Sequence, residues 1–127
     1  MAHQTATSLE QQAHRLFEFI DAMDAAAMTA IMTDDVQGVD ELSRGWLRGH
    51  AAVEDYFERM RGLIDDLHSE LREVRADEWG DAAVVTGVLD QTYMLDGRHQ
   101  RITAPTSVTF RREQGEWKVA LLHSVPI

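Results

Sequence analysis

Runs of apolar, β-branched and aromatic residues between turn signals predict three long strands in the last third of the chain. The stretch from Ala82 to Leu95 is rich in Val, Leu, Thr and Tyr, which suit a half-buried pleated surface. It ends at Asp96-Gly97, a dipeptide typical of two-residue hairpins. A second strand is expected from Arg98 to Arg112 and a third from Trp117 to Val125, with a Gly-containing turn between them. Because strands of this length twist and curl, we expect a half-cone around a packed interior.

Apolar residues at helical spacing predict three helices in the first half of the chain. A capping signal at Ser8 precedes the first helix, Asp24 caps a short second one, and Gly49 leads into the third. A short strand is expected from Val36 to Leu42, and the first long strand from Leu67 to Trp79. The resulting order is α-α-β-α-β-β-β-β. It predicts an α+β fold in which a cone-shaped, curved antiparallel sheet wraps around the three helices.

Composition narrows the class of protein. With 127 residues and 44% hydrophobic residues, a single domain over residues 1–127 is expected, with a loose start at residues 1–7. The absence of cysteine excludes disulfides, thiolate metal sites and a cysteine nucleophile. A net charge of −10 without a basic face argues against nucleic-acid binding. The sequence has no secretory signal pattern and no apolar run near the roughly 18 residues of a membrane span, so a cytoplasmic protein without membrane contact is expected.

Three separated segments resemble one known superfamily. They are "DAMDAAAMTAIMTDDV", "WLRGHAAVEDYF" and "SVTFRREQGEWKVALLHS". Together with the element order, they resemble the nuclear transport factor 2-like superfamily, and within it the SnoaL-like and ketosteroid-isomerase-like branch. The likeness spans Leu9 to Val125. It implies the cone fold, whereas the reaction stays open because this superfamily includes isomerases, cyclases, hydrolases, dehydratases and members without catalysis.

The resemblance also implies site residues. In the steroid isomerase branch the general base is an aspartate on the first short strand, and Asp40, five residues after Asp35, occupies that place. The tyrosine and the acidic residue that hold the oxyanion in that branch fall on Leu16 and Ser107 here. Neither residue donates a hydrogen bond as strongly as a phenol or a protonated carboxyl group, so the electrophilic part of the site is expected to differ.

The expected cone assigns each strand residue to a face. Thr86 and Asp90, together with Ser107 and Thr109 on the next strand, are predicted to face the cavity. The alternate residues would then form an apolar patch on the outer face, and such a patch indicates an interface. We therefore predict a homodimer through the sheet face, formed by Val85, Leu89, Val108 and Phe110.

Two carboxylates in a partly apolar pocket are what acid–base chemistry needs, because burial and mutual repulsion separate their pKa values. The candidate catalytic residues are therefore Asp40 and Asp90, with His123 as a proton shuttle or orienting donor. The alternatives are that Asp40 ends a strand, that Asp90 lies at a solvated mouth and that His123 is a half-buried structural residue. The predicted substrate pocket consists of Leu16, Trp46, Tyr56, Phe57, Met60, Thr86, Ser107 and Thr109.

No cofactor or metal is expected, because the histidines are scattered and no phosphate-binding loop, nucleophile elbow or dinucleotide fingerprint is present. Two functions fit these residues. One is an isomerase or cyclase that removes a proton next to a carbonyl of an apolar, polyketide-, terpenoid- or steroid-like substrate. The other is a non-catalytic module of the same fold that binds an apolar small molecule or dimerises. A water-activating hydrolase, such as an epoxide-opening enzyme, is a weaker third hypothesis.

Overall fold

The computed structural model describes residues 2–40 and 44–125, and for residues 2–8 and Asp40 it describes the backbone alone. Two helices, α1 (Ala2–Asp21) and α2 (Ala25–Ala30), come first. Strands β1 (Met32–Asp40) and β2 (Gly45–Arg48) precede α3 (His50–Arg61). Four strands complete the chain, namely β3 (Ile64–Trp79), β4 (Ala82–Leu95), β5 (Arg98–Glu113) and β6 (Glu116–Ser124).

The strands form one six-stranded sheet in the order β2-β1-β6-β5-β4-β3. Among the described strand pairs, β1 and β6 run parallel and the others antiparallel, so the predicted antiparallel sheet is mixed but mostly antiparallel. The α+β class and the order of the long strands are as predicted. The sequence interpretation missed β2, and it placed the end of β1 at Leu42, which lies outside the described residues. It also placed the start of α1 at Leu9, whereas α1 begins at Ala2.

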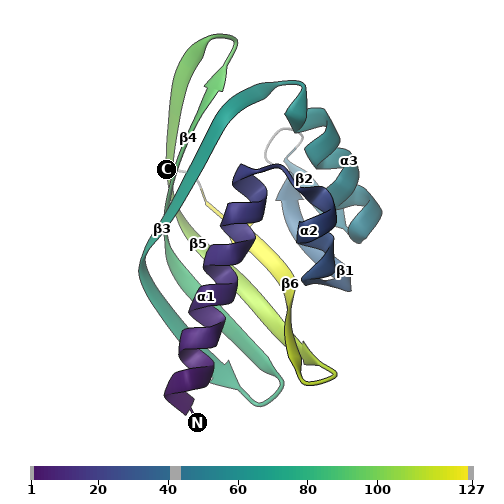
Figure 1. Ribbon diagram of the computed structural model, residues 1–127, viewed down its shortest axis with the longest axis vertical. Coiled ribbons are helices and arrows are strands. Elements are labelled where there is room, and N and C mark those ends of the chain that lie inside the picture. Colours follow the sequence, from purple (N-terminus) through teal and green to yellow (C-terminus); the bar gives the residue numbers. More distant parts are fainter. Residues whose placement is uncertain (1, 41–43, 126–127) are drawn as a thin grey trace.

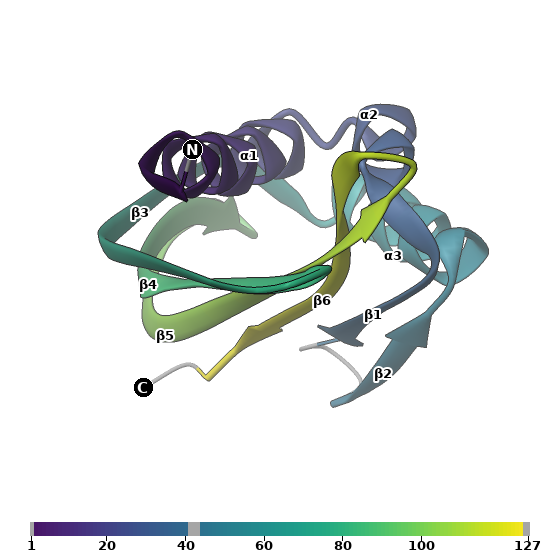
Figure 2. The ribbon, with the colours of Figure 1, turned by 90° about the horizontal axis from the view of Figure 1, so that it is seen from below.

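The helices lie on the concave side of the curled sheet. Figure 1 shows α1 crossing the long strands, with α2 and α3 beside β1 and β2. Figure 2 shows the sheet curling beneath α1. The main core is one cluster of buried residues from all three helices and the strands, in which Leu9, Leu16 and Met28 are fully buried.

Local backbone geometry explains the turns and part of the curl. Asp96 (φ 51°) and Gly97 (φ 75°) form the two-residue hairpin between β4 and β5 that the Asp-Gly dipeptide predicts. A register shift between Arg72 and Arg75 bends β3, and Glu73 within it has a φ of 55°. Opposite this bulge, a Cβ on Gly87 would lie 2.9 Å from the Arg72 carbonyl oxygen, so a residue without a side chain lets the two strands approach.

The predicted assignment of sheet faces is wrong. The four residues assigned to an outer dimer patch, Val85, Leu89, Val108 and Phe110, are at most 6% exposed and pack in the core on the side of α1. Side chains alternate along a strand, and Thr86, Asp90, Ser107 and Thr109 therefore lie on the outer, convex face. The physical reason is that the apolar stripe of α1 needs an apolar partner, and burying it outweighs placing polar residues toward a cavity.

Candidate functional site

A cavity lies between the helices and the concave face of the sheet. It has two adjoining chambers of about 90 Å³ and about 270 Å³ that share six lining residues. The larger chamber is just below the usual range of small-molecule sites, roughly 300–1,000 Å³. Its wall consists of Phe17, Ile20, Met23, Val39, Tyr56, Phe57, Met60, Ile64, Leu67, Gln91, Tyr93, Ile102, Leu122 and Ser124.

The wall is apolar, with a few uncharged polar groups. Three of these, Gln91, Tyr93 and Ser124, come from the sheet, and Tyr56 comes from α3. Gln91 and Tyr93 follow Leu89 at spacing two along β4, so they lie on the same face as the core residues. The Ser124 hydroxyl lies 2.9 Å from the Thr106 hydroxyl, which itself donates to the Ala104 carbonyl oxygen, so Ser124 is the donor of this pair.

A hydrogen-bonded chain runs from the end of α1 to the cavity wall. Asp21 accepts from the Ser69 backbone N–H (2.8 Å) and from the Ser69 hydroxyl (2.6 Å). The Gln91 amide nitrogen then donates to the Ser69 hydroxyl oxygen at 3.0 Å. Burial raises the pKa of Asp21 above 3.8, and the hydrogen bonds from Ser69 oppose that rise. The carboxylate of Asp21 therefore lies behind the cavity wall, and the neutral amide of Gln91 is the group of this chain that reaches the cavity surface.

Only some of the predicted pocket residues line the cavity. Tyr56, Phe57 and Met60 on α3 do so. Leu16 is fully buried in the core and contributes to neither chamber. Trp46 is 52% exposed.

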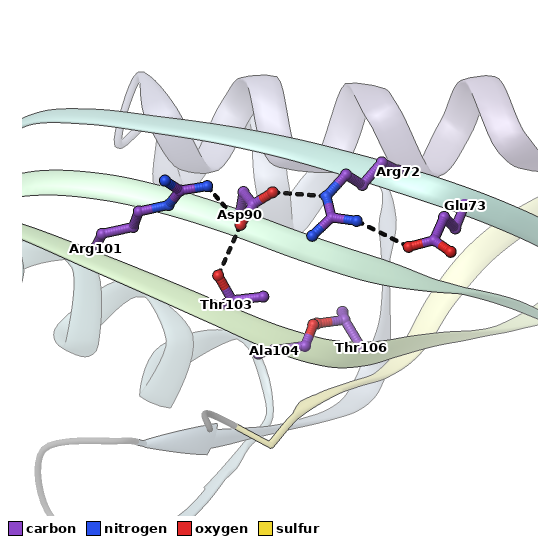
Figure 3. Close-up of polar contacts among 7 residues, drawn as sticks. All are labelled: Arg72, Glu73, Asp90, Arg101, Thr103, Ala104 and Thr106. Carbon is purple, nitrogen blue, oxygen red and sulfur yellow. Dashed lines mark hydrogen bonds and ion pairs between the residues drawn. The ribbon is translucent and has the colours of Figure 1, made fainter.

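Asp90, one of the predicted catalytic residues, lies in an ion-pair cluster on the convex face. Figure 3 shows the side chains of Arg72, Arg101 and Thr103 directed toward its carboxylate. The Arg72 and Arg101 nitrogens lie 2.7 and 3.4 Å from the carboxylate oxygens, and the Thr103 hydroxyl donates to one of them at 2.8 Å. The Arg72 hydrogen bond, followed by that of Thr103, lowers the pKa of Asp90 to about 2. Such a carboxylate is ionised near neutral pH, which argues against a role as general acid. Its ion pairs with Arg72 and Arg101 favour a structural role.

The other two predicted catalytic residues have different positions. His123 is exposed and, like Ser107, with which it pairs, lies on the convex face, its ring 6.2 Å from that of Trp46. Asp40 is the last residue of β1 and pairs with Gly45, but its side chain lies outside the described residues. The structure therefore brings no two of the predicted catalytic residues together within its described part.

Sequence reasoning missed Asp21, Ser69 and Gln91. The available signal was the spacing-two series Val85, Gly87, Leu89, Gln91, which identifies Gln91 as a concave-face residue once Val85 is placed in the core. Neither a metal site nor a membrane span is found in residues 2–40 and 44–125: no three His, Asp or Glu side chains gather there, and no helix is long and apolar enough to cross a membrane.

Comparisons with known proteins agree with this fold. The family model of the SnoaL-like domain matches residues 9–127. No curated protein matches the chain. Among solved structures, a nuclear transport factor 2-like superfamily protein from Salmonella enterica has a TM-score of 0.89 at 16% identity, covering 99% of this chain and 93% of that one.

Two further solved structures are similar at low identity. A ketosteroid isomerase-like protein from Erwinia carotovora atroseptica has a TM-score of 0.79 at 20% identity, covering 93% of this chain and 92% of that one. The CaMKII hub of S. rosetta has a TM-score of 0.84 at 17% identity and covers 96% of each chain. At such identities the likeness shows the nuclear transport factor 2-like fold, and it leaves activity open.

Proposed function

Since the chain belongs to the SnoaL-like domain family, whose fold carries many functions, we propose from its own cavity that it binds a small, neutral, mostly apolar molecule there. The observation that carries this proposal is the wall of the larger chamber, which joins Phe, Ile, Leu and Met side chains to a few uncharged polar groups. Apolar lining with a few placed polar groups is typical of small-molecule sites. A volume of about 270 Å³ restricts the ligand to a compact molecule.

The proposal is tested by blocking the cavity and measuring binding of 2-naphthol, a compact neutral two-ring compound. Leu122 lines both chambers, so Leu122→Trp fills the site. Leu121, the preceding residue of β6, pairs with Thr109 on the convex face, and Leu121→Trp is the matched control. We expect Leu122→Trp to weaken binding by about tenfold or more and Leu121→Trp to leave it unchanged. Equal affinity in both variants would contradict the proposal.

An acid–base isomerase or cyclase is the second candidate, with Asp40 as the base. The observation that favours it is that Gly38 and Val39, which directly precede Asp40 on β1, line the cavity. If Asp40 is the base, Asp40→Asn is expected to abolish turnover of a carbonyl compound and to leave the binding of that compound intact. If the wild type turns over none of a panel of carbonyl compounds that carry a hydrogen on the α-carbon, the binding function alone stands.

We also propose that the chain self-associates through the convex face of the sheet, opposite to the patch first predicted. Trp46 is half-exposed there, and Val88 and Pro105 add apolar surface that is at least partly accessible. The similarity to the CaMKII hub supports this proposal. Sedimentation at increasing protein concentration tests it, and a monomer at every concentration would contradict it.

A further inference from the structure

Gln91 provides the one side-chain amide among the described residues that line the larger chamber, whose other polar side chains there are the hydroxyl-bearing Tyr56, Tyr93 and Ser124. None of the described residues lining the larger chamber carries a charged side chain. A charged ligand would therefore lose its hydration without gaining a counter-ion, which favours a neutral one. The polar end of such a ligand needs a partner, because an unpaired polar group in an apolar site costs binding free energy.

The direction of the Gln91 amide follows from the hydrogen bonds behind it. Ionised Asp21 can only accept, so the Ser69 hydroxyl proton points to Asp21. The Ser69 oxygen can then only accept a hydrogen bond from Gln91. Of the two ends of the Gln91 amide, only the NH2 group can donate it. Asp21 and Ser69 thus fix one N–H of Gln91, and within the described part of the chain its carbonyl oxygen and second N–H have no hydrogen-bond partner.

We propose that Gln91 is the specificity-determining residue of this cavity and that it selects molecules carrying a hydroxyl group on an otherwise apolar frame. A hydroxyl donates to the free carbonyl oxygen of Gln91 or accepts from its free N–H, whereas a hydrocarbon leaves both groups unpaired. This inference rests on the proposed binding function and adds the chemistry of the ligand. Asp21 and Ser69 are positioning residues, which act through the amide.

The test compares two probes of nearly the same shape, 2-naphthol and 2-methylnaphthalene, which differ by a hydroxyl against a methyl group. The measured quantity is the ratio of their dissociation constants, obtained from chemical-shift titrations of 15N-labelled protein. A ratio cancels the shared apolar contacts, and comparing it between wild type and variant cancels the different hydration of the probes.

The variant is Gln91→Met, which keeps a similar unbranched volume and removes the amide. Gln11→Met makes the same chemical change at an exposed position on α1 and is the control. We expect Gln91→Met to reduce the preference for 2-naphthol by about two- to tenfold, the contribution of one neutral hydrogen bond. Gln11→Met is expected to leave the preference unchanged.

Three outcomes overturn the inference in distinguishable ways. An unchanged preference in Gln91→Met refutes the role of Gln91 and leaves the cavity as a binding site. If the wild type binds neither probe, the proposed function fails together with the inference. If Gln91→Met does not fold, the test is instead made on the wild type, by following the side-chain NH2 resonances of Gln91 during both titrations. They are expected to shift with 2-naphthol more than with 2-methylnaphthalene, and equal shifts refute the role.

Discussion

The placement of Phe110 in the core gives a sharp test of which sheet face lines the cavity. Phe110 is 0% exposed and lies between Ala83 on β4 and Val119 on β6, both also 0% exposed. Truncating a fully buried Phe to Ala costs about 3–5 kcal/mol, from lost apolar burial and the cavity left behind. Small domains have a free energy of unfolding of about 5–15 kcal/mol, so Phe110→Ala removes a large part of it.

Urea unfolding followed by tryptophan fluorescence measures this loss, because Trp117 is 7% exposed and reports on the core. With a slope of about 2 kcal/mol per molar urea, a loss of about 4 kcal/mol moves the midpoint down by about 2 M. Thr109→Ala, one residue earlier on the convex face, is expected to cost at most about 1 kcal/mol, the range of strand propensity.

The two variants together separate the core from an interface. If Phe110 lay at a dimer contact on the outer face, Phe110→Ala would shift the monomer–dimer equilibrium and barely change unfolding of the monomer. Equal losses of free energy in Phe110→Ala and Thr109→Ala, or a loss below about 1 kcal/mol in the former, would refute the assignment of faces.

Two further predictions concern the carboxylates. The pKa of Asp90 is lowered to about 2, so the stability it contributes is complete above its unfolded-state value of 3.8 and is lost as the pH falls toward 2. The difference in unfolding free energy between wild type and Asp90→Asn is therefore expected to shrink over that range, and a constant difference would contradict the role of the Arg72 ion pair. Ser69→Ala removes the hydroxyl donor to Asp21, so the pKa of Asp21 should rise further above 3.8 and stability at neutral pH should fall by about 1–2 kcal/mol. When the pKa of a carboxyl group is raised in the folded state, the free energy of unfolding falls as the pH rises through that pKa. The loss of stability caused by Ser69→Ala should therefore be smaller in acid than at neutral pH. A carboxyl 13C titration and unfolding at two pH values check this, and an unchanged pKa would contradict it.

Local chemistry made much of the fold predictable. The Asp96-Gly97 hairpin was confirmed because two residues with positive φ are needed at that turn and the dipeptide supplies them. Helices two and three were found because Asp24 and Gly49 mark their starts. The long strands were found because β-branched and aromatic residues gather between turn signals.

The faces of the sheet and the polar chain at the cavity were not predictable in the same way. A shift of one residue exchanges the two faces of a strand, and Val85 and Thr86 fit either assignment until the position of α1 is known. The contact of Asp21 with Ser69 joins residues 48 positions apart, and no local pattern indicates it. Strand β2 was missed because four residues are too few to show a period.

The binding of a neutral apolar molecule in the cavity is tested most directly by mapping 2-naphthol on the 15N-labelled protein. We expect the largest backbone shift changes at Phe57, Gln91, Ile102 and Leu122, which come from four different elements that meet at the larger chamber. Changes confined to convex-face residues such as Thr86, Ser107 and His123, or no change at any concentration, would contradict the assignment of this cavity as the site.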